Sequence, residues 1–188
     1  PSISGRFGLT GPVWPVNPKR PEMEGLACFP SVAALPAAPD VAFVAVPREA
    51  AVEAVRALAA IGAGGAVCYA SGFGEVGSEG EALEQQLIAA AGDMPVFGPN
   101  CYGFVSYLDR IAMWPDEHGG KPVESGAAIV TQSGNIGVNL TMQRRGLPLA
   151  GLYTLGNQAV VSMADMVAAL AEDERVTAIG LHIEGLDD

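Results

Sequence analysis

The strand-like runs of this chain of 188 residues share one feature, because each ends in a loop of Gly, Pro, Asn, Ser or Glu. These loops are 15–19, 46–48, 70–75, 98–101, 131–135 and 183–185. In an open α/β sheet, ligands bind outside the carboxyl ends of the strands, and these residue types suit a phosphate-bearing ligand there. The pattern therefore predicts an α/β protein that binds a nucleotide-like molecule.

The order of the elements predicts a parallel sheet in the first half of the chain. Residues 41–46 are continuously apolar, as in a strand that is covered on both faces. Residues 48–61 then place Val52 and Val55 at helical spacing, which indicates a helix with one apolar stripe. Further strands are predicted over 13–16, 66–69 and 94–97. Ser78 and Glu81 form a capping box, which predicts the start of another helix.

A second βα series follows a polar, Gly-rich stretch at 118–126, which is the best candidate for a linker. We therefore predict two domains, 1–122 and 123–188. Strands are predicted over 127–130, 152–154 and 178–183, and a helix over 136–145. Another helix is predicted after Ser162, which forms a second capping box with Asp165. The second domain is expected to be partial, and the first is expected to lack its opening strand and Gly-rich turn.

Charge and composition exclude several classes of protein. The formal net charge is -11 without a basic stripe, so a nucleic-acid partner is not expected. An anionic ligand would need local donors, of which Lys19, Arg20 and Arg48 follow strand ends. The longest uncharged stretch, 57–74, is broken by glycines, which argues against a membrane span. Three cysteines without metal-ligand spacing indicate a reducing compartment, so we expect a cytoplasmic protein.

The loop at 131–135 follows a strand and opens a helix. Free backbone N–H groups and the positive end of the helix dipole would face an anion placed there. Ser133 or Asn135 could equally be an ordinary helix cap, and the sequence leaves both interpretations open.

Glu184 ends an apolar strand, where a carboxylate must either have a function or face water. His182 would lie on the same strand face, and His118 falls in the linker. A single His within an apolar strand is more often a hydrogen-bonded core residue than a catalyst, so neither His is assigned a catalytic role.

Several of these segments, taken in order, resemble the NDP-forming acyl-CoA synthetases, the relatives of the succinyl-CoA synthetase α subunit. The segments are 15–19, 31–36, 40–47, 71–75, 98–103, 132–134, 156–157 and 184–185. The resemblance implies a Rossmann-like CoA-binding domain with a parallel sheet, followed by a truncated flavodoxin-like ligase domain.

The same resemblance implies a role for particular residues. The CoA site would be lined by Asn17, Pro18, Lys19, Val46, Pro47, Arg48, Ser71, Gly72, Glu75 and Asn100. In this family a histidine on a mobile loop carries the phosphoryl group. Ser133, Gly134 and Asn135 would form the helix start that receives this phosphohistidine, and Glu184 would orient its imidazole. The histidine itself has no match in this chain.

As a whole, the resemblance implies an enzyme that makes acyl-CoA from a small carboxylic acid, CoA and ATP or GTP with Mg²⁺. It also implies an ATP-grasp β subunit or fused domain as partner. Exposed apolar strand edges would allow a homo-oligomer. Two alternatives stay open: a non-catalytic acyl-CoA-sensing module of a larger protein, and a dinucleotide-binding protein.

Overall fold

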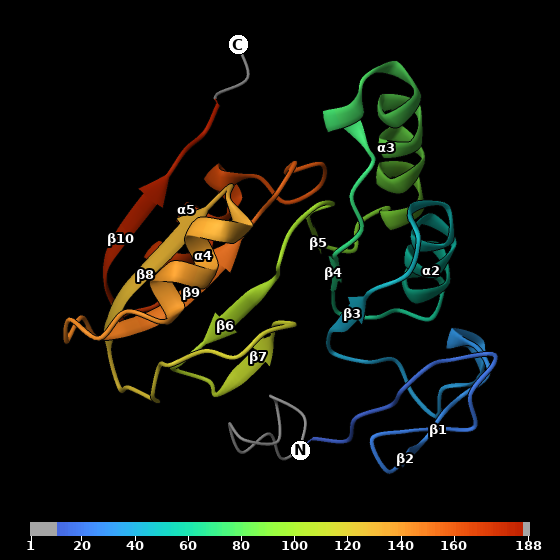
Figure 1. Cartoon of the computed structure of the whole chain (residues 1–188), viewed down its shortest axis with the longest axis horizontal. Helices are drawn as coiled ribbons and strands as arrows, with labels where there is room; N and C mark the ends of the chain where they lie inside the picture. Colours follow the sequence, from blue (N-terminus) through green and yellow to red (C-terminus); the bar gives the residue numbers. More distant parts are fainter. Residues whose placement is uncertain (1–10, 186–188) are drawn as a thin grey trace.

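The computed structural model describes residues 11–185, which form two lobes; the chain passes from the first lobe to the second through residues 98–103 (Figure 1). Each lobe is built on its own sheet, with three strands in the first lobe and five in the second. The mixed α/β fold with parallel sheets agrees with the prediction from the sequence. No helix within residues 11–185 is long and apolar enough to cross a membrane.

The first lobe is a parallel sheet with two helices on one face. Its strands, in spatial order, are β3 (Ala42–Val44), β4 (Ala66–Cys68) and β5 (Val96–Phe97). Its helices are α2 (Arg48–Ala60) and α3 (Ser78–Ala91). Val55 of α2 and Leu87 of α3 are fully buried, and they belong to the same core cluster as Cys68 of β4 and Val96 of β5. Burying this apolar face stabilises the lobe.

The start of α3 differs from the predicted capping box. The N-cap residue is Gly77 rather than Ser78, and no side chain caps the helix there. Gly77 has a φ of 92°, a conformation that glycine adopts at low cost. Because this turn ends at Gly77, Ser78 already lies inside the helix and cannot act as its cap.

The segment before β3 forms little regular structure. It contains the antiparallel pair β1 (Glu22–Met23) and β2 (Leu26–Ala27) and the 3₁₀-helix η1 (Val32–Ala34). The strand predicted over 13–16 is present only as a single parallel bridge between Val16 and Phe29. A strand needs a continuous partner for its N–H and C=O groups, and β3 does not pair with this segment.

The second lobe has helices on both faces of its sheet. Its strand order is β10-β8-β9-β6-β7, with β8, β9 and β10 parallel and β6 and β7 antiparallel to their neighbours. The strands are β6 (Phe104–Ser106), β7 (Ile111–Met113), β8 (Gly126–Thr131), β9 (Leu149–Thr154) and β10 (Val176–His182). The helices are α4 (Gly134–Thr141) and α5 (Met163–Ala171). Separate buried clusters lie under α4 and α5, so the lobe has three layers.

The sheets divide the chain earlier than the predicted linker. Strands β6 and β7 precede residue 122 but belong to the second sheet, because β6 pairs with β9. The Gly-rich stretch connects β7 to β8 within one lobe, and Gly120 packs against the ring of the buried Tyr107, where a Cβ atom would overlap it. The domains 1–122 and 123–188 remain a prediction, and the strand pairing favours a division between β5 and β6.

The two lobes are joined by hydrogen bonds as well as by the chain. After β9, the segment 157–161 runs beside β5 and its backbone donates to the carbonyl groups of Pro99, Gly98 and Val96. The rings of Phe97 and Phe104 meet edge to face across the junction. This segment of the second lobe therefore extends the hydrogen bonding of the first sheet at β5.

Candidate functional site

The loops after β3, β4 and β5 lie side by side at the carboxyl edge of the first sheet. The backbone N–H of Asn100 donates to the carbonyl of Ala70 at 2.8 Å. Arg48 Nη1 donates to the carbonyl of Gly72, also at 2.8 Å. These contacts bring together residues of 46–48, 71–75 and 100, which the sequence places at three separate strand ends.

Glu75 shapes the loop between β4 and α3. Its carboxylate accepts hydrogen bonds from the backbone N–H of Gly72 at 2.6 Å and of Phe73 at 3.1 Å. The next N–H, that of Gly74, donates to Glu84 of α3 at 3.3 Å. Partial burial raises the pKa of Glu75, but the hydrogen bonds to its carboxylate outweigh this effect and lower the pKa. The loop therefore holds two carboxylates against three successive N–H groups.

Arg48 lies at the predicted edge, but its guanidinium is already engaged. Its Nε pairs with Glu49 at 2.9 Å and its Nη2 with Glu79 at 2.7 Å. Together with the bond to Gly72, these contacts fix the start of α2 against the β4–α3 loop. A ligand phosphate would have to compete with two carboxylates for this cation.

Asn17, Pro18 and Lys19 are not brought into contact with the other predicted residues. The Asn17 carboxamide oxygen accepts from the backbone N–H groups of Lys19 and Arg20, which forms a local turn. Figure 1 draws the blue segment around β1 and β2 at the lower right, away from the β4–α3 loop at the top. The side chain of Lys19 is exposed and has no ion pair among the described residues.

The remaining residues of this edge offer apolar and polar contacts. Val46 is 41% exposed, and Pro47 beside it is also exposed. Asn100 is exposed, with a φ of 59°, a left-handed conformation that Asn tolerates better than most residues. The edge thus combines an apolar rim with a side-chain amide.

In the second lobe, Ser133 and Glu184 flank the point at which the strand order reverses. The chain passes from β8 to β9 on one side and then returns to β10 on the other side of β8. In such sheets the crevice at this switch point is the usual ligand site. The Ser133 hydroxyl caps α4 by accepting from the N–H of Ile136 at 3.4 Å. Gly134 and Asn135 belong to the first turn of α4, whose N–H groups have no acceptor within the helix.

The side chain of Gln132 joins the two loops of this crevice. Its Oε1 accepts from the N–H groups of Glu184 at 2.5 Å and Gly185 at 2.9 Å, and its Nε2 donates to the carbonyl of Gly185 at 2.8 Å. Below it, the Thr131 hydroxyl lies 3.1 Å from Nδ1 of His182. The Glu184 side chain is exposed, so a carboxylate is held at the rim of the crevice.

A row of aromatic rings connects the two sites. Tyr69 at the end of β4 contacts Tyr102 at 5.7 Å between ring centroids, and Tyr102 contacts Trp114 at 5.4 Å. A Cβ atom on Gly134 would lie 2.6 Å from the ring of Tyr102, so only glycine allows this approach to the start of α4. The carboxyl edge of the first sheet and the start of α4 are therefore neighbours.

Comparison with known proteins identifies the first lobe. Residues 6–107 match the model of a family described as a CoA binding domain. The chain belongs to this CoA-binding family. Residues 124–188 match a second family model, described as the succinyl-CoA ligase like flavodoxin domain. The resemblance to NDP-forming acyl-CoA synthetases is thereby confirmed.

Individual relatives agree with this assignment. The chain is 36% identical to a trans-feruloyl-CoA synthase from an unknown prokaryotic organism, and the match covers 96% of this chain and 27% of that protein. It is 29% identical to the α subunit of an ADP-forming acetate–CoA ligase II from Pyrococcus furiosus, over 95% of this chain and 39% of that subunit. The chain therefore spans about a quarter to two fifths of these relatives.

Solved structures show the same fold. The dinucleotide forming acetyl-coenzyme A synthetase 1 from Ca. Korarchaeum cryptofilum superimposes with a TM-score of 0.85 at 30% identity, covering 98% of this chain and 40% of that chain. It has been solved in an apo form and in complex with phosphate and ADP. Both lobes of the CoA-binding protein are included in this likeness.

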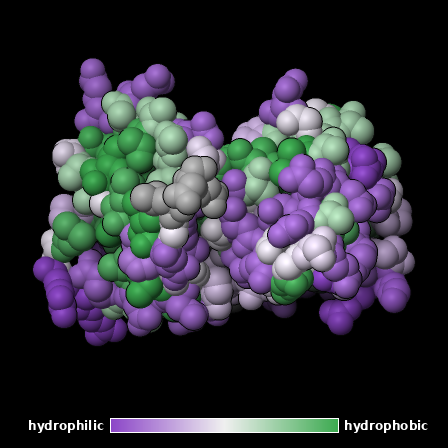
Figure 2. Space-filling view, turned by 90° about the horizontal axis from the view of Figure 1, so that it is seen from above, coloured by the Kyte–Doolittle hydropathy of each residue, from purple (hydrophilic) through white to green (hydrophobic). Residues whose placement is uncertain are grey.

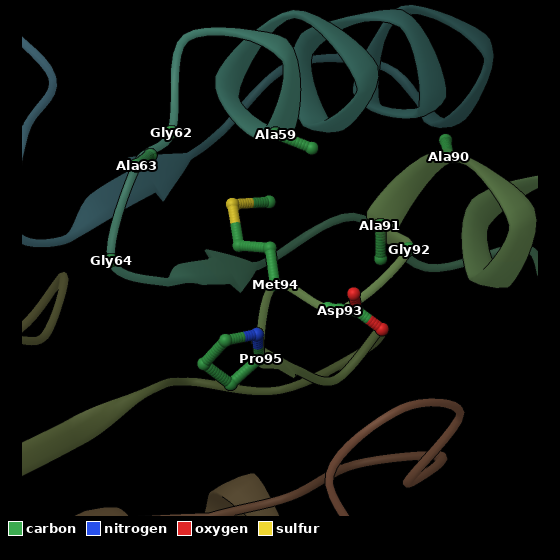
Figure 3. Close-up of a pocket in the computed structure, with 10 residues that line it drawn as sticks. All are labelled: Ala59, Gly62, Ala63, Gly64, Ala90, Ala91, Gly92, Asp93, Met94 and Pro95. Atoms are coloured by element: carbon green, nitrogen blue, oxygen red, sulfur yellow. The ribbon is translucent and has the colours of Figure 1, made fainter.

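A depression of about 510 Å³ lies at the other edge of the CoA-binding lobe. The ends of α2 and α3 line it, with small residues such as Ala59 and Ala90, and Figure 3 shows Met94 pointing toward Ala59 and Ala63. Asp93 is its only charged lining residue. This edge holds the amino ends of the strands, so the depression is separate from the predicted CoA site.

Two residues of the site received no individual role from the sequence. Gln132 and Asn157 both lie in segments that carry the family resemblance, but their side-chain partners are 52 to 82 residues away. No local pattern predicts such contacts, so only the folded chain reveals them.

Proposed function

We propose that this chain is the CoA-binding and partial ligase portion of an NDP-forming acyl-CoA synthetase. The complete enzyme would convert a small carboxylic acid, CoA and ATP or GTP into acyl-CoA, ADP or GDP, and phosphate. The observation that carries this proposal is the closeness of two strand-end sites, one at the edge of the first sheet and one at the start of α4.

The edge of the first sheet suits CoA in its chemistry. Val46 and Pro47 would contact the adenine or pantetheine, and Asn100 would hydrogen-bond to a polar group of the ligand. Ser71 and Gly72 lie on the β4–α3 loop that Glu75 holds in place. Arg48 would contact a CoA phosphate at this edge in competition with Glu49 and Glu79, and Lys19 and Arg20 would contribute only where the ligand reaches the separate 17–20 turn.

The crevice of the second lobe suits a phosphorylated imidazole. First-turn N–H groups at Ser133, Gly134 and Asn135 would face the phosphoryl group, and the helix dipole favours a negative charge there. Glu184 would accept a hydrogen bond from one ring N–H, which leaves the other nitrogen free to carry the phosphoryl group. Gln132 supports this role because it holds the Glu184 loop beside the start of α4.

The complete enzyme would also need a nucleotide-binding partner. An ATP-grasp β subunit or fused domain would bind ATP or GTP with Mg²⁺, in line with the separate α subunit of the Pyrococcus furiosus relative and the ADP complex of the archaeal structure. The three free cysteines suit the reducing cytoplasm as its location.

Calorimetry with the isolated chain tests the CoA site. We expect CoA and acetyl-CoA to give saturable heats and to raise the melting temperature, because binding to the native state alone stabilises it. NAD, at the same concentrations, is the control and should give neither effect. Absence of any response to CoA at about millimolar concentration, or an equal response to NAD, would contradict the proposal.

A further inference from the structure

We propose that Asn157 is a positioning residue of the CoA site, although it belongs to the other lobe. This inference rests on the proposed function, because it concerns the same CoA-binding edge. Asn157 lies just after β9, in the segment that runs beside β5.

The Asn157 carboxamide holds two carboxylates at once. Its Nδ2 donates to Glu75 Oε2 at 2.5 Å and to Glu84 Oε2 at 2.9 Å. These are the same carboxylates that accept the backbone N–H groups of Gly72, Phe73 and Gly74. The conformation of the β4–α3 loop therefore depends on a donor from the second lobe.

The amide is needed because the two carboxylates share one donor nitrogen and so lie close together. Two like charges at such a distance repel each other unless hydrogen bonds compensate. Arg48 contacts this loop through the carbonyl of Gly72, but its guanidinium is paired with Glu49 and Glu79 and not with Glu75 or Glu84. Asn157 thus supplies two N–H groups at the point where negative charge is concentrated, without adding a charge of its own.

Asn157 also fixes the loop after β5. Its backbone N–H donates to Pro99 at 3.0 Å, and its Oδ1 accepts from Asn100 Nδ2 at 3.4 Å. Gly156 before it has a φ of 53°, and a Cβ atom there would lie 2.3 Å from the Pro99 carbonyl oxygen. Gly156 thus allows the close approach that brings Asn157 between the β4–α3 loop and the loop after β5.

Replacement by aspartate gives the sharpest test. Asn157→Asp keeps the shape but exchanges the donor for a third carboxylate facing Glu75 and Glu84. We expect CoA affinity, measured by calorimetry on the same chain at about pH 8, to fall by about tenfold or more. At about pH 6 the loss should shrink, because protonation within the three-carboxylate cluster removes part of the repulsion. The wild-type pKa of Glu75 is lowered, so wild-type affinity should change less over this range.

Two further variants keep the test decisive. Gln86→Glu makes the same amide-to-carboxylate change on the exposed face of α3, near Glu84, and should leave CoA affinity within about twofold of wild type. If Asn157→Asp does not fold, a double-mutant cycle of Asn157→Ala and Glu75→Gln replaces it, and non-additive losses of CoA affinity are expected.

The results separate this inference from the proposed function. If the wild-type chain does not bind CoA, the proposed function fails. If the wild type binds but Asn157→Asp binds equally well, or loses no more affinity than Gln86→Glu, the role of Asn157 is overturned. Additive losses in the double-mutant cycle would overturn it as well.

Discussion

Thr154, at the end of β9, binds the backbone of Gly103, which lies between β5 and β6, through its side-chain hydroxyl. The fully buried Oγ1 accepts from the N–H of Gly103 and donates to its carbonyl, both at 2.8 Å. The Gly103 carbonyl also accepts from the backbone N–H of Thr154, whereas the acceptor of the Gly103 N–H is the Thr154 hydroxyl. One buried hydroxyl therefore contacts both polar backbone groups of Gly103.

We predict that Thr154→Val lowers the free energy of unfolding by about 2 kcal/mol, because it leaves a buried N–H without an acceptor. Thr154→Ser keeps the hydroxyl and removes only a methyl group, so it should cost about 1 kcal/mol. Urea unfolding followed by circular dichroism measures both values. A Val variant as stable as wild type would show that the junction does not need this acceptor.

His118 is a single residue that should make the stability of the protein depend on pH. It packs against the buried ring of Tyr107 at 5.6 Å, and its burial lowers the pKa of the imidazole. A lowered pKa means that the unfolded chain binds the proton more readily, so stability falls as the pH drops below about 6.5. Tyr107 belongs to the core under α4, which links this titration to the packing of the second lobe.

We expect the melting temperature to fall by a few degrees between about pH 7.5 and pH 5.5, and part of this fall should vanish in His118→Gln. Calorimetric scans of both proteins at each pH provide the measurement. Identical pH profiles would mean that His118 does not contribute. The variant is the proper reference because the formal charge of -11 also becomes less negative as the pH falls.

Among the elements, α3 and α5 show the same sequence signal with different outcomes. The capping box predicted for Ser162 and Asp165 is confirmed, since Asp165 N–H donates to Ser162 Oγ at 3.1 Å and Ser162 N–H donates to the Asp165 carboxylate at 2.9 Å. The box predicted for Ser78 and Glu81 is absent. The two motifs are alike in sequence, so the backbone conformation before each helix determines whether its Ser becomes the N-cap.

We therefore predict that Ser162→Ala destabilises the protein by about 1 kcal/mol, the usual cost of losing an N-cap. Ser78→Ala is the matched control and should be neutral or slightly stabilising, because alanine favours the helix interior. Chemical denaturation of the two variants measures the difference. Equal effects would contradict the assignment of Gly77 as the cap of α3.

The first turn of α4 is the element that carries the candidate phosphate site. The helix α4 spans Gly134–Thr141, so it begins two residues before and ends four residues before the predicted helix over 136–145. The capping interpretation of Ser133 is confirmed, since its hydroxyl accepts from the N–H of Ile136. The anion-site interpretation stays a prediction, and capping does not conflict with it because it uses the N–H of Ile136 and not those of Gly134 and Asn135. A cap and an anion site are therefore compatible at one position.

At the scale of the whole molecule, the chain forms two lobes with a notch between them. Figure 2, seen from the top of Figure 1, shows these lobes, with hydrophobic surface mainly on the lobe of the second sheet. Exposed apolar side chains of that lobe include Leu181 and Ile183, at 47% and 43% exposure. Such surface at the outer strand β10 fits the expected homo-oligomer or partner domain.

The division of strands between the lobes leads to a prediction about fragments. A fragment of residues 101–188 keeps β6 and β7 beside β9, whereas a fragment of 123–188 leaves the edge of β9 unpaired and uncovers Leu152. We expect the longer fragment to give dispersed amide resonances in NMR spectra and the shorter one to aggregate. A well-folded shorter fragment would favour the boundary at 122.

The sequence alone determined the βα alternation, the helix faces and the strand-end loops, because these depend on periodicity and on local residue types. It also carried the family resemblance, which the comparisons confirm. Only the tertiary structure decided that Gln132 holds Glu184, that Asn157 holds Glu75 and Glu84, and that β6 joins β9. These contacts join residues dozens of positions apart, and their geometry arises only once the sheets have packed.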